Sequence, residues 1–226
     1  MKTICLIAHD QFTASSSQQF LVTSGQIFTD VEFVDINSEW TQAEGFDGTR
    51  EIKRLSHYDR IVFQFPLYWY QAPAILKIWF DQTFSDQTNL EWAKSHLREK
   101  QFGLVVVAGS GRNKYQRGGA AGVTISELVS PYLAWANYFD LEFIPPFVLY
   151  QFHYLSEKEK QALILDYVCY LLNGKLASLE DRYSFIFNQL KQLNLSLSSL
   201  DQMVFDDFVK ELEDKQAELQ EFRLLD

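Results

Sequence analysis

The sequence predicts an open, doubly wound α/β sheet followed by a helical extension. Short apolar runs rich in β-branched and aromatic residues alternate with segments whose apolar residues recur at helical spacing. Strands that are separated by helices pair in parallel through right-handed crossovers, so one parallel sheet covered on both faces is expected. The chain has 226 residues, of which 47% are hydrophobic and 22% charged, enough to bury one large core.

Five strands are expected along the chain, over residues 3–8, 31–36, 59–65, 102–108 and 141–144. Their short length and β-branched content favour strand over helix. The helices expected around them cover residues 15–28, a segment that begins at Pro73, residues 123–139 and residues 156–172. Proline is tolerated in the first turn of a helix, and Ser156 with Glu159 has the spacing of a capping box.

The character of the sequence changes after about residue 174, so we expect a sheet domain over 1–174 and an acidic helical extension over 175–226. The extension should form helices over 179–193 and 200–225. Residues 201–226 hold nine acidic and three basic side chains and therefore account for most of the net charge of −10. One face of the last helix would be apolar and could pack on the domain, mediate dimerisation, cover the site or bind a partner: Leu200, Met203, Val204, Phe208 and Leu212.

Composition excludes several classes of protein. Cys5 and Cys169 lie apart in apolar patterns with no CxxC motif, which indicates core positions in a reducing compartment rather than a metal or redox site. The first apolar run ends at His9, too early for a signal peptide, and no run reaches membrane-spanning length. We therefore expect a cytoplasmic protein without membrane insertion. The negative charge argues against a nucleic-acid partner.

Three loops should meet at the carboxyl edge of the sheet, where open parallel sheets bind ligands. The first follows residues 3–8 and contains His9, Ser15, Ser17 and Gln18. Hydroxyls and backbone N–H groups at a helix N-terminus bind anions, aided by the helix dipole. A capped helix without a ligand explains the same residues equally well. The P-loop pattern and the glycine fingerprint of Rossmann folds are both missing from the sequence.

The second loop follows the third strand and is aromatic. Its flat rings and backbone amides suit a planar heteroaromatic ligand, although aromatic residues that cover the end of the sheet as core remain an equal alternative. The residues concerned are Pro66, Leu67, Tyr68, Trp69 and Tyr70.

The third loop, over residues 108–122, is rich in glycine and allows close approach of the backbone to a ligand. It holds Gly109, Ser110 and Gly111, and the phenol of Tyr115 could reach a reacting centre. A mobile surface loop is the alternative. Taken together, a loop that can bind phosphate, a loop that can bind a planar ring and a flexible loop that can cover both indicate a mononucleotide cofactor, above all FMN.

The segment over residues 63–81, FQFPLYWYQAPAILKIWFD, closely resembles the signature of flavodoxin-like NAD(P)H:quinone oxidoreductases. This group includes bacterial general-stress oxidoreductases and the ancillary subunits of potassium-efflux systems. Further matching stretches are Ala8-His9 with residues 15–18, the glycine-rich loop with Tyr115, residues 125–128 with Pro131, and Pro145-Pro146. The resemblance covers about residues 2–173 and leaves the extension outside it.

The resemblance implies a flavodoxin-like fold with a five-stranded parallel sheet in the order 2-1-3-4-5, bound FMN (FAD is possible) and a homodimer. It also implies a ping-pong cycle in which NAD(P)H reduces the flavin and a quinone or similar acceptor is then reduced at the same site. His9, Ser15, Ser17 and Gln18 would hold the phosphate. Residues 66–70 would line the ribityl chain and the ring, residues 109–111 would close over it, and Tyr115 would stabilise charge on the reduced ring.

The sequence departs from the family pattern at several positions. Gln18 stands where asparagine is usual, and Ala121 stands where some members carry a proton-donating histidine. These changes leave FMN binding intact but put proton handling and the choice of acceptor in doubt. Two functions therefore stay open: an FMN-dependent NAD(P)H oxidoreductase, and a flavin-binding regulatory or accessory subunit, for example of a transport system, with little turnover.

Overall fold

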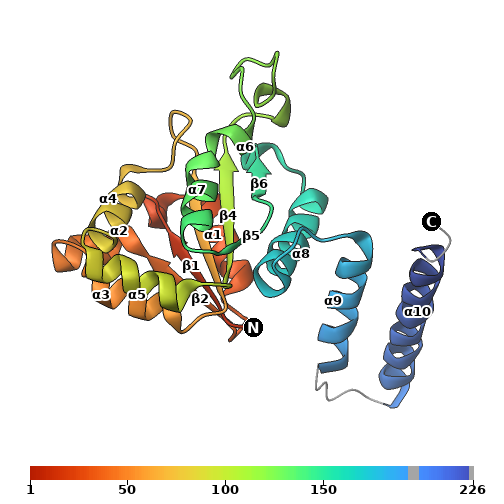
Figure 1. The fold of residues 1–226 in the computed structure, drawn as a ribbon. Coiled ribbons are helices and arrows are strands. Elements are labelled where there is room, and N and C mark those ends of the chain that lie inside the picture. Colours follow the sequence, from red (N-terminus) through yellow and green to blue (C-terminus); the bar gives the residue numbers. More distant parts are fainter. Residues whose placement is uncertain (193–198, 224–226) are drawn as a thin grey trace. The chain divides into compact units, whose positions relative to one another are not determined.

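The structure is a computed structural model that describes residues 1–192 and 199–223 (Figure 1). The chain divides into two compact units, Met1–Lys175 and Leu176–Asp226. The first unit is built on a parallel sheet whose strands follow the order β2-β1-β3-β4-β5, with β6 also paired to β4, so the predicted flavodoxin-like topology is confirmed. The strands are β1 (Thr3–Ile7), β2 (Val31–Asp35), β3 (Arg60–Pro66), β4 (Gln101–Ala108), β5 (Glu142–Phe143) and β6 (Phe147–Tyr150).

Helices cover both faces of this sheet. They are α1 (Ser16–Gly25), α2 (Ile36–Ala43), α3 (Gly48–Ser56), α4 (Ala74–Thr83), α5 (Gln87–Leu97), α6 (Ile125–Leu128), α7 (Ser130–Tyr138) and α8 (Glu157–Asn173). α1 packs against α8, and α3 packs against α4 and α5. Successive side chains of a strand point to opposite faces, so Phe63 and Phe65 of β3 join the core with Trp79 of α4, while Gln64 points to the face covered by α1 and α8.

Two expected elements are wrong in detail because proline interrupts them. The fifth strand does not end at residue 144: it is split by Pro145 and Pro146 into β5 and β6, which both pair with β4. The single helix expected over 123–139 is two helices, α6 and α7, separated at Val129, since Pro131 lacks the N–H that a continuous helix would need. The capping box of Ser156 and Glu159 at the start of α8 is present.

Three helices were not expected from the sequence. α2, α3 and α5 each begin after an aspartate whose side chain accepts hydrogen bonds from backbone N–H groups of the first turn: Asp35, Asp47 and Asp86. Aspartate is a favoured N-cap for this reason, so the signal was present in the sequence.

The second unit consists of α9 (Leu179–Gln192) and α10 (Ser199–Arg223), which pack against each other. Met203, Val204 and Phe208 of the expected apolar face are exposed, whereas the side chain of Leu200 lies outside the described residues. Among the residues with a described structure, none of the helices has both the length and the apolar character needed to cross a bilayer.

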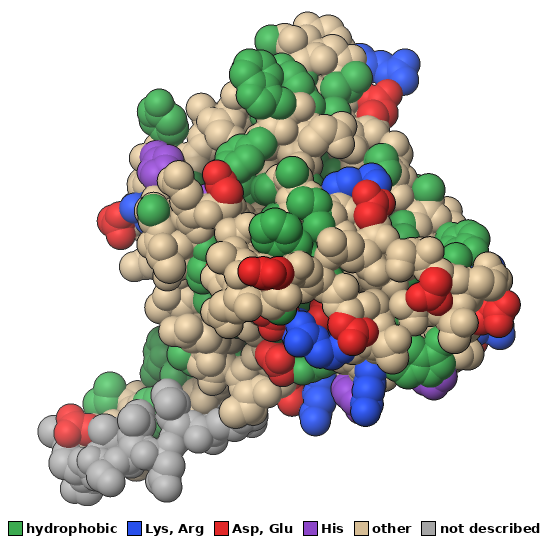
Figure 2. All heavy atoms as spheres, turned by 90° about the vertical axis from the view of Figure 1, so that its left-hand side faces the viewer, with side chains coloured by type: hydrophobic (Ala, Val, Ile, Leu, Met, Phe, Trp, Pro, Cys, Tyr) green, Lys and Arg blue, Asp and Glu red, His purple; other side chains and the backbone are tan. Residues whose placement is uncertain are grey.

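Figure 2 shows one face of the molecule, on which positive and negative side chains are interspersed around patches of hydrophobic residues. A nucleic-acid surface would instead show clustered lysine and arginine. On this face the lysine and arginine side chains lie beside aspartate and glutamate side chains (Figure 2).

Candidate functional site

The three loops singled out in the sequence leave the carboxyl ends of β1, β3 and β4, which are neighbours in the sheet. Backbone hydrogen bonds tie the strand ends together: the Ala8 N–H donates to the Gln64 carbonyl at 2.9 Å, and the Leu67 N–H donates to the Val107 carbonyl at 2.9 Å. The loops that follow β3 and β4 rise from the same edge of the sheet (Figure 1). One ligand at this edge can therefore contact all three loops.

The N-terminus of α1 lacks the acidic cap that α2, α3 and α5 carry. Ser15 is its N-cap residue, yet its side chain makes no capping bond within the described chain, and the first turn holds no acidic residue. The Ser15 and Ser17 hydroxyl oxygens lie 3.4 Å apart. An anion at this end would meet hydroxyl donors and the positive end of the helix dipole without competition from a carboxylate.

Gln18, in the first turn of α1, is fully buried. Its Oε1 accepts a hydrogen bond of 2.7 Å from Nε2 of Gln64, and its own Nε2 has no hydrogen-bond partner among the described residues. Such a buried donor costs about 1–3 kcal/mol unless something accepts from it. A phosphate oxygen is an acceptor, so the residues around this helix end fit a phosphate group.

His9 is 6% exposed and links this loop to the aromatic loop. Its Nδ1 accepts a bond of 2.9 Å from the Gln11 N–H, which places the ring proton on Nε2, 3.2 Å from the hydroxyl oxygen of Tyr68. Burial lowers the pKa of His9, and the negative charges of Asp10 and Asp35 oppose this shift only in part. The ring is therefore a neutral donor towards Tyr68 at neutral pH.

The lowered pKa of His9 predicts a pH-dependent stability. The unfolded chain binds the proton more readily, so the contribution of His9 is fully present above about pH 6.5 and is lost as the pH falls through the folded-state pKa. Urea unfolding should show that His9→Asn costs more stability at pH 7.5 than at pH 5.5. The same replacement at the exposed His96 serves as the control. An equal cost of His9→Asn at both pH values would contradict the assignment.

The aromatic loop forms a tight hairpin. The N–H groups of Tyr68 and Gln71 each donate to the carbonyl of the other, at 2.8 and 3.0 Å, and the two residues between them have positive φ angles, 48° at Trp69 and 68° at Tyr70. Each left-handed residue other than glycine costs about 1–2 kcal/mol. Strain of this kind persists mainly where the surroundings impose it, and it is concentrated at functional sites.

The tip of this hairpin and the glycine-rich loop enclose a cavity of about 200 Å³. Tyr115 is 9% exposed there, and the ammonium of Lys114 lies 5.7 Å from the centre of the Tyr70 ring and 3.4 Å from the hydroxyl oxygen of Ser110. Flat rings and a cation suit a planar ligand that carries negative charge. The lining residues are Leu67, Trp69, Tyr70, Gly109, Ser110, Lys114 and Tyr115.

Some of the expected residues do not line this cavity. Pro66 is buried at the end of β3, and Tyr68 turns towards His9, with the two ring centres 5.9 Å apart. Gly111 packs against Gln151, whose Oε1 would lie 2.8 Å from an added Cβ. Tyr68 thus connects the aromatic hairpin to His9 and Asp10 of the loop that follows β1.

Comparison with known protein families identifies the family of this chain. A family model described as flavodoxin-like fold matches residues 1–168 of the chain. The chain belongs to this flavodoxin-like family. It is also similar to general stress protein 14 of Bacillus subtilis, with 33% identity over 159 residues that span 70% of this chain and 90% of the relative.

Two solved structures resemble this flavodoxin-like protein. One is described as an NADPH-quinone reductase from P. pentosaceus, with 32% identity, a TM-score of 0.66, and coverage of 76% of this chain and 99% of that chain. The other is general stress protein 14 from Treponema denticola in complex with FMN, with 26% identity, a TM-score of 0.66, and coverage of 76% and 98%.

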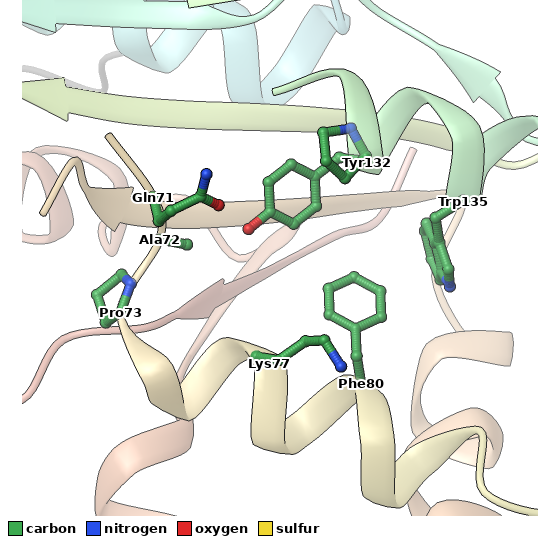
Figure 3. A pocket seen from close by; sticks show the side chains of 8 residues that line it. Gln71, Ala72, Pro73, Lys77, Phe80, Tyr132 and Trp135 are labelled. Atoms are coloured by element: carbon green, nitrogen blue, oxygen red, sulfur yellow. The ribbon is translucent and has the colours of Figure 1, made fainter. Parts of the chain in front are cut away.

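A second and larger cavity of this flavodoxin-like protein was not expected from the sequence. It has a volume of about 570 Å³ and lies between α4 and α7, where Phe80 and Tyr132 face each other and Gln71 of the hairpin stands beside them (Figure 3). Its walls are mostly apolar: Gln71, Ala72, Pro73, Lys77, Phe80, Pro131, Tyr132 and Trp135. The hairpin therefore contributes residues to both cavities.

Sequence reasoning also missed Lys114 and the left-handed turn at Trp69 and Tyr70. Lys114 adjoins Tyr115 in the sequence, which was a usable signal. The turn contains neither glycine nor asparagine, so no local signal marks it. In the described part of the chain, His, Cys, Asp and Glu side chains form no group of three that could hold a metal ion.

Proposed function

We propose that this protein is an FMN-dependent NAD(P)H oxidoreductase that passes two electrons to a quinone or a similar electrophilic acceptor. One observation carries the proposal: an aromatic cavity lies at the same edge of the sheet as the N-terminus of α1. Within the described residues that N-terminus has no side-chain cap, and the buried Gln18 Nε2 has no hydrogen-bond partner. The FMN complex and the NADPH-quinone reductase among the similar structures support the cofactor and the reaction class.

The roles of the residues follow from their chemistry. Ser15, Ser17 and Gln18 would hold the phosphate with hydrogen-bond donors. His9, which the resemblance places beside the phosphate, has its ring proton directed at Tyr68 and would position that side chain. The backbone of residues 66–70 would line the ribityl chain, Trp69 and Tyr70 would lie against the ring, and residues 109–111 would close over it. Bound FMN supplies the hydride chemistry, and the protein supplies orientation and electrostatics. NAD(P)H and the acceptor would bind in turn at the same site, as the resemblance implies.

The phenol of Tyr115 would stabilise negative charge on the cofactor when that group is reduced. Replacement by phenylalanine is expected to lower turnover by about 10- to 100-fold, since a hydrogen bond to a charged group contributes about 1.5–3 kcal/mol, while FMN stays bound. Tyr150→Phe is the control, because the Tyr150 ring packs 6.1 Å from that of Tyr115 but does not line the cavity. Loss of FMN from Tyr115→Phe would contradict this role.

The enzyme can be distinguished from an accessory subunit by its redox cycle. NADPH or NADH should bleach the flavin absorbance under anaerobic conditions, and a quinone should restore it rapidly. A protein that binds FMN but is not bleached would support the accessory function instead. We also propose a homodimer, as the resemblance implies, and light scattering of the full chain would test it.

A further inference from the structure

A chain of buried hydrogen bonds runs behind the proposed phosphate site, from α8 through the sheet to α1. Tyr167 of α8 donates its hydroxyl proton to Oε1 of Gln64 at 2.6 Å, and Nε2 of Gln64 donates to Oε1 of Gln18 at 2.7 Å. Cys5 of β1 donates to the same Gln64 oxygen at 3.7 Å. All four side chains are at most 1% exposed. Burying polar side chains at such depth costs folding free energy unless the side chains are hydrogen-bonded to one another.

The direction in which these hydrogen bonds donate is set at the α8 end of the network. Burial raises the pKa of both the Tyr167 phenol and the Cys5 thiol, so each keeps a proton to donate. The Gln64 oxygen is therefore turned to these two donors, and its NH₂ group is turned to Gln18. In the reverse orientation the Gln64 NH₂ would donate to the Tyr167 oxygen, and the buried phenol proton would exchange an amide oxygen for the weak acceptor Sγ of Cys5.

The consequence appears at the first turn of α1. The Gln18 oxygen accepts the bond from Gln64, so the Gln18 Nε2 lies outside this network. Within the described residues that Nε2 has no hydrogen-bond partner. If the Gln18 amide were flipped, an acceptor atom would be left over instead, and a phosphate would be repelled. The orientation of one buried amide thus decides whether the turn that carries Ser15 and Ser17 presents a further donor.

We propose that Gln64 and Tyr167 are positioning residues for the cofactor phosphate, which hold the Gln18 amide with its NH₂ group free to donate. This inference rests on the proposed function, since it needs a phosphate-bearing cofactor at α1. Neither residue touches the cofactor: both act through Gln18.

The test compares the affinity of the apoprotein for FMN and for riboflavin, which lacks the phosphate, by quenching of flavin fluorescence. Tyr167→Phe should weaken FMN binding about three- to tenfold and Gln64→Leu about tenfold or more, because one hydrogen bond contributes about 0.5–1.5 kcal/mol and one to a charged group more. Riboflavin affinity should stay within about twofold. A merely structural role would weaken both ligands alike.

Tyr170→Phe is the matched control. Tyr170 lies on the same helix and is equally buried, and its hydroxyl oxygen accepts a bond of 3.1 Å from the Leu104 N–H, but it has no part in the chain to Gln18. Its replacement should leave the ratio of FMN to riboflavin affinity unchanged. In a Gln18→Leu background, Tyr167→Phe should have no further effect on that ratio, since the residue through which it acts is gone.

The outcomes separate this inference from the proposed function. If the wild-type protein binds FMN but Tyr167→Phe and Gln64→Leu leave the ratio of affinities unchanged, the positioning role is wrong and the proposed function stands. If the wild-type protein binds neither flavin, both are overturned. A selective loss of FMN affinity in these two variants, with Tyr170→Phe unaffected, supports the inference.

Discussion

Gly174→Ala is expected to destabilise the first unit by about 3 kcal/mol or more. Gly174 ends α8 with φ = 68°, and an added Cβ would lie 2.3 Å from Oε1 of Gln101 and 2.6 Å from Nη2 of Arg60. Arg60 is fully buried, and it donates to Gln101 at 2.6 Å and to the carbonyl of Leu171 at 2.5 Å. The substitution adds left-handed strain of about 1–2 kcal/mol and disturbs a buried charge.

Gly122→Ala provides the matched control. Gly122 has the same φ angle of 68°, but nothing lies within 4 Å of an added Cβ. Its replacement should therefore cost only the strain, about 1–2 kcal/mol. Urea unfolding followed by circular dichroism would measure both variants, and equal losses of stability would show that Arg60 and Gln101 tolerate the extra methyl group.

Ser15→Asp is expected to have opposite effects on stability and on cofactor binding. An aspartate at this N-cap can accept from first-turn N–H groups, as Asp35 does at α2, and should stabilise the apoprotein by about 0.5–1 kcal/mol. It should also repel the FMN phosphate. Two unit charges about 4 Å apart near a protein surface interact by about 4 kcal/mol, which corresponds to roughly a thousandfold loss of affinity.

Ser24→Asp controls for the added charge. Ser24 lies in the last turn of the same helix, where a carboxylate opposes the helix dipole, so this variant should lose stability and keep its FMN affinity. Riboflavin should bind Ser15→Asp far better than FMN does. If Ser15→Asp bound FMN normally, the phosphate would have to lie somewhere other than the N-terminus of α1.

The parallel strands and the place of the candidate site could be predicted because they follow from patterns that are local in the sequence, whereas the order of the strands was implied by the family resemblance. Each strand is a short apolar run, and the loop after each run must leave the carboxyl edge once the strands are parallel. The helices α2, α3 and α5 were missed although Asp35, Asp47 and Asp86 marked their starts. The division of the last strand was missed because the residues beyond Pro145 and Pro146 were not expected to rejoin the sheet.

The inner parts of the site depend on contacts between distant residues, which no local pattern carries. Gln18 was expected as a phosphate ligand at the start of the first helix, but its full burial and its pairing with Gln64, 46 residues further along the chain, were not expected. The left-handed conformation of Trp69 and Tyr70 has a local cause, the hairpin bonds between Tyr68 and Gln71, but no glycine or asparagine marks it in the sequence. Sequence reasoning therefore indicated where the candidate site lies, whereas the internal geometry of that region required the structure.

The central claim is that the N-terminus of α1 and the cavity between the hairpin and the glycine-rich loop bind a single FMN. Titration of the purified apoprotein with FMN, followed by flavin fluorescence, tests it most directly. We predict saturable quenching with one FMN for each chain, and tighter binding of FMN than of riboflavin. A colourless protein that leaves the fluorescence of added FMN unchanged would contradict the account.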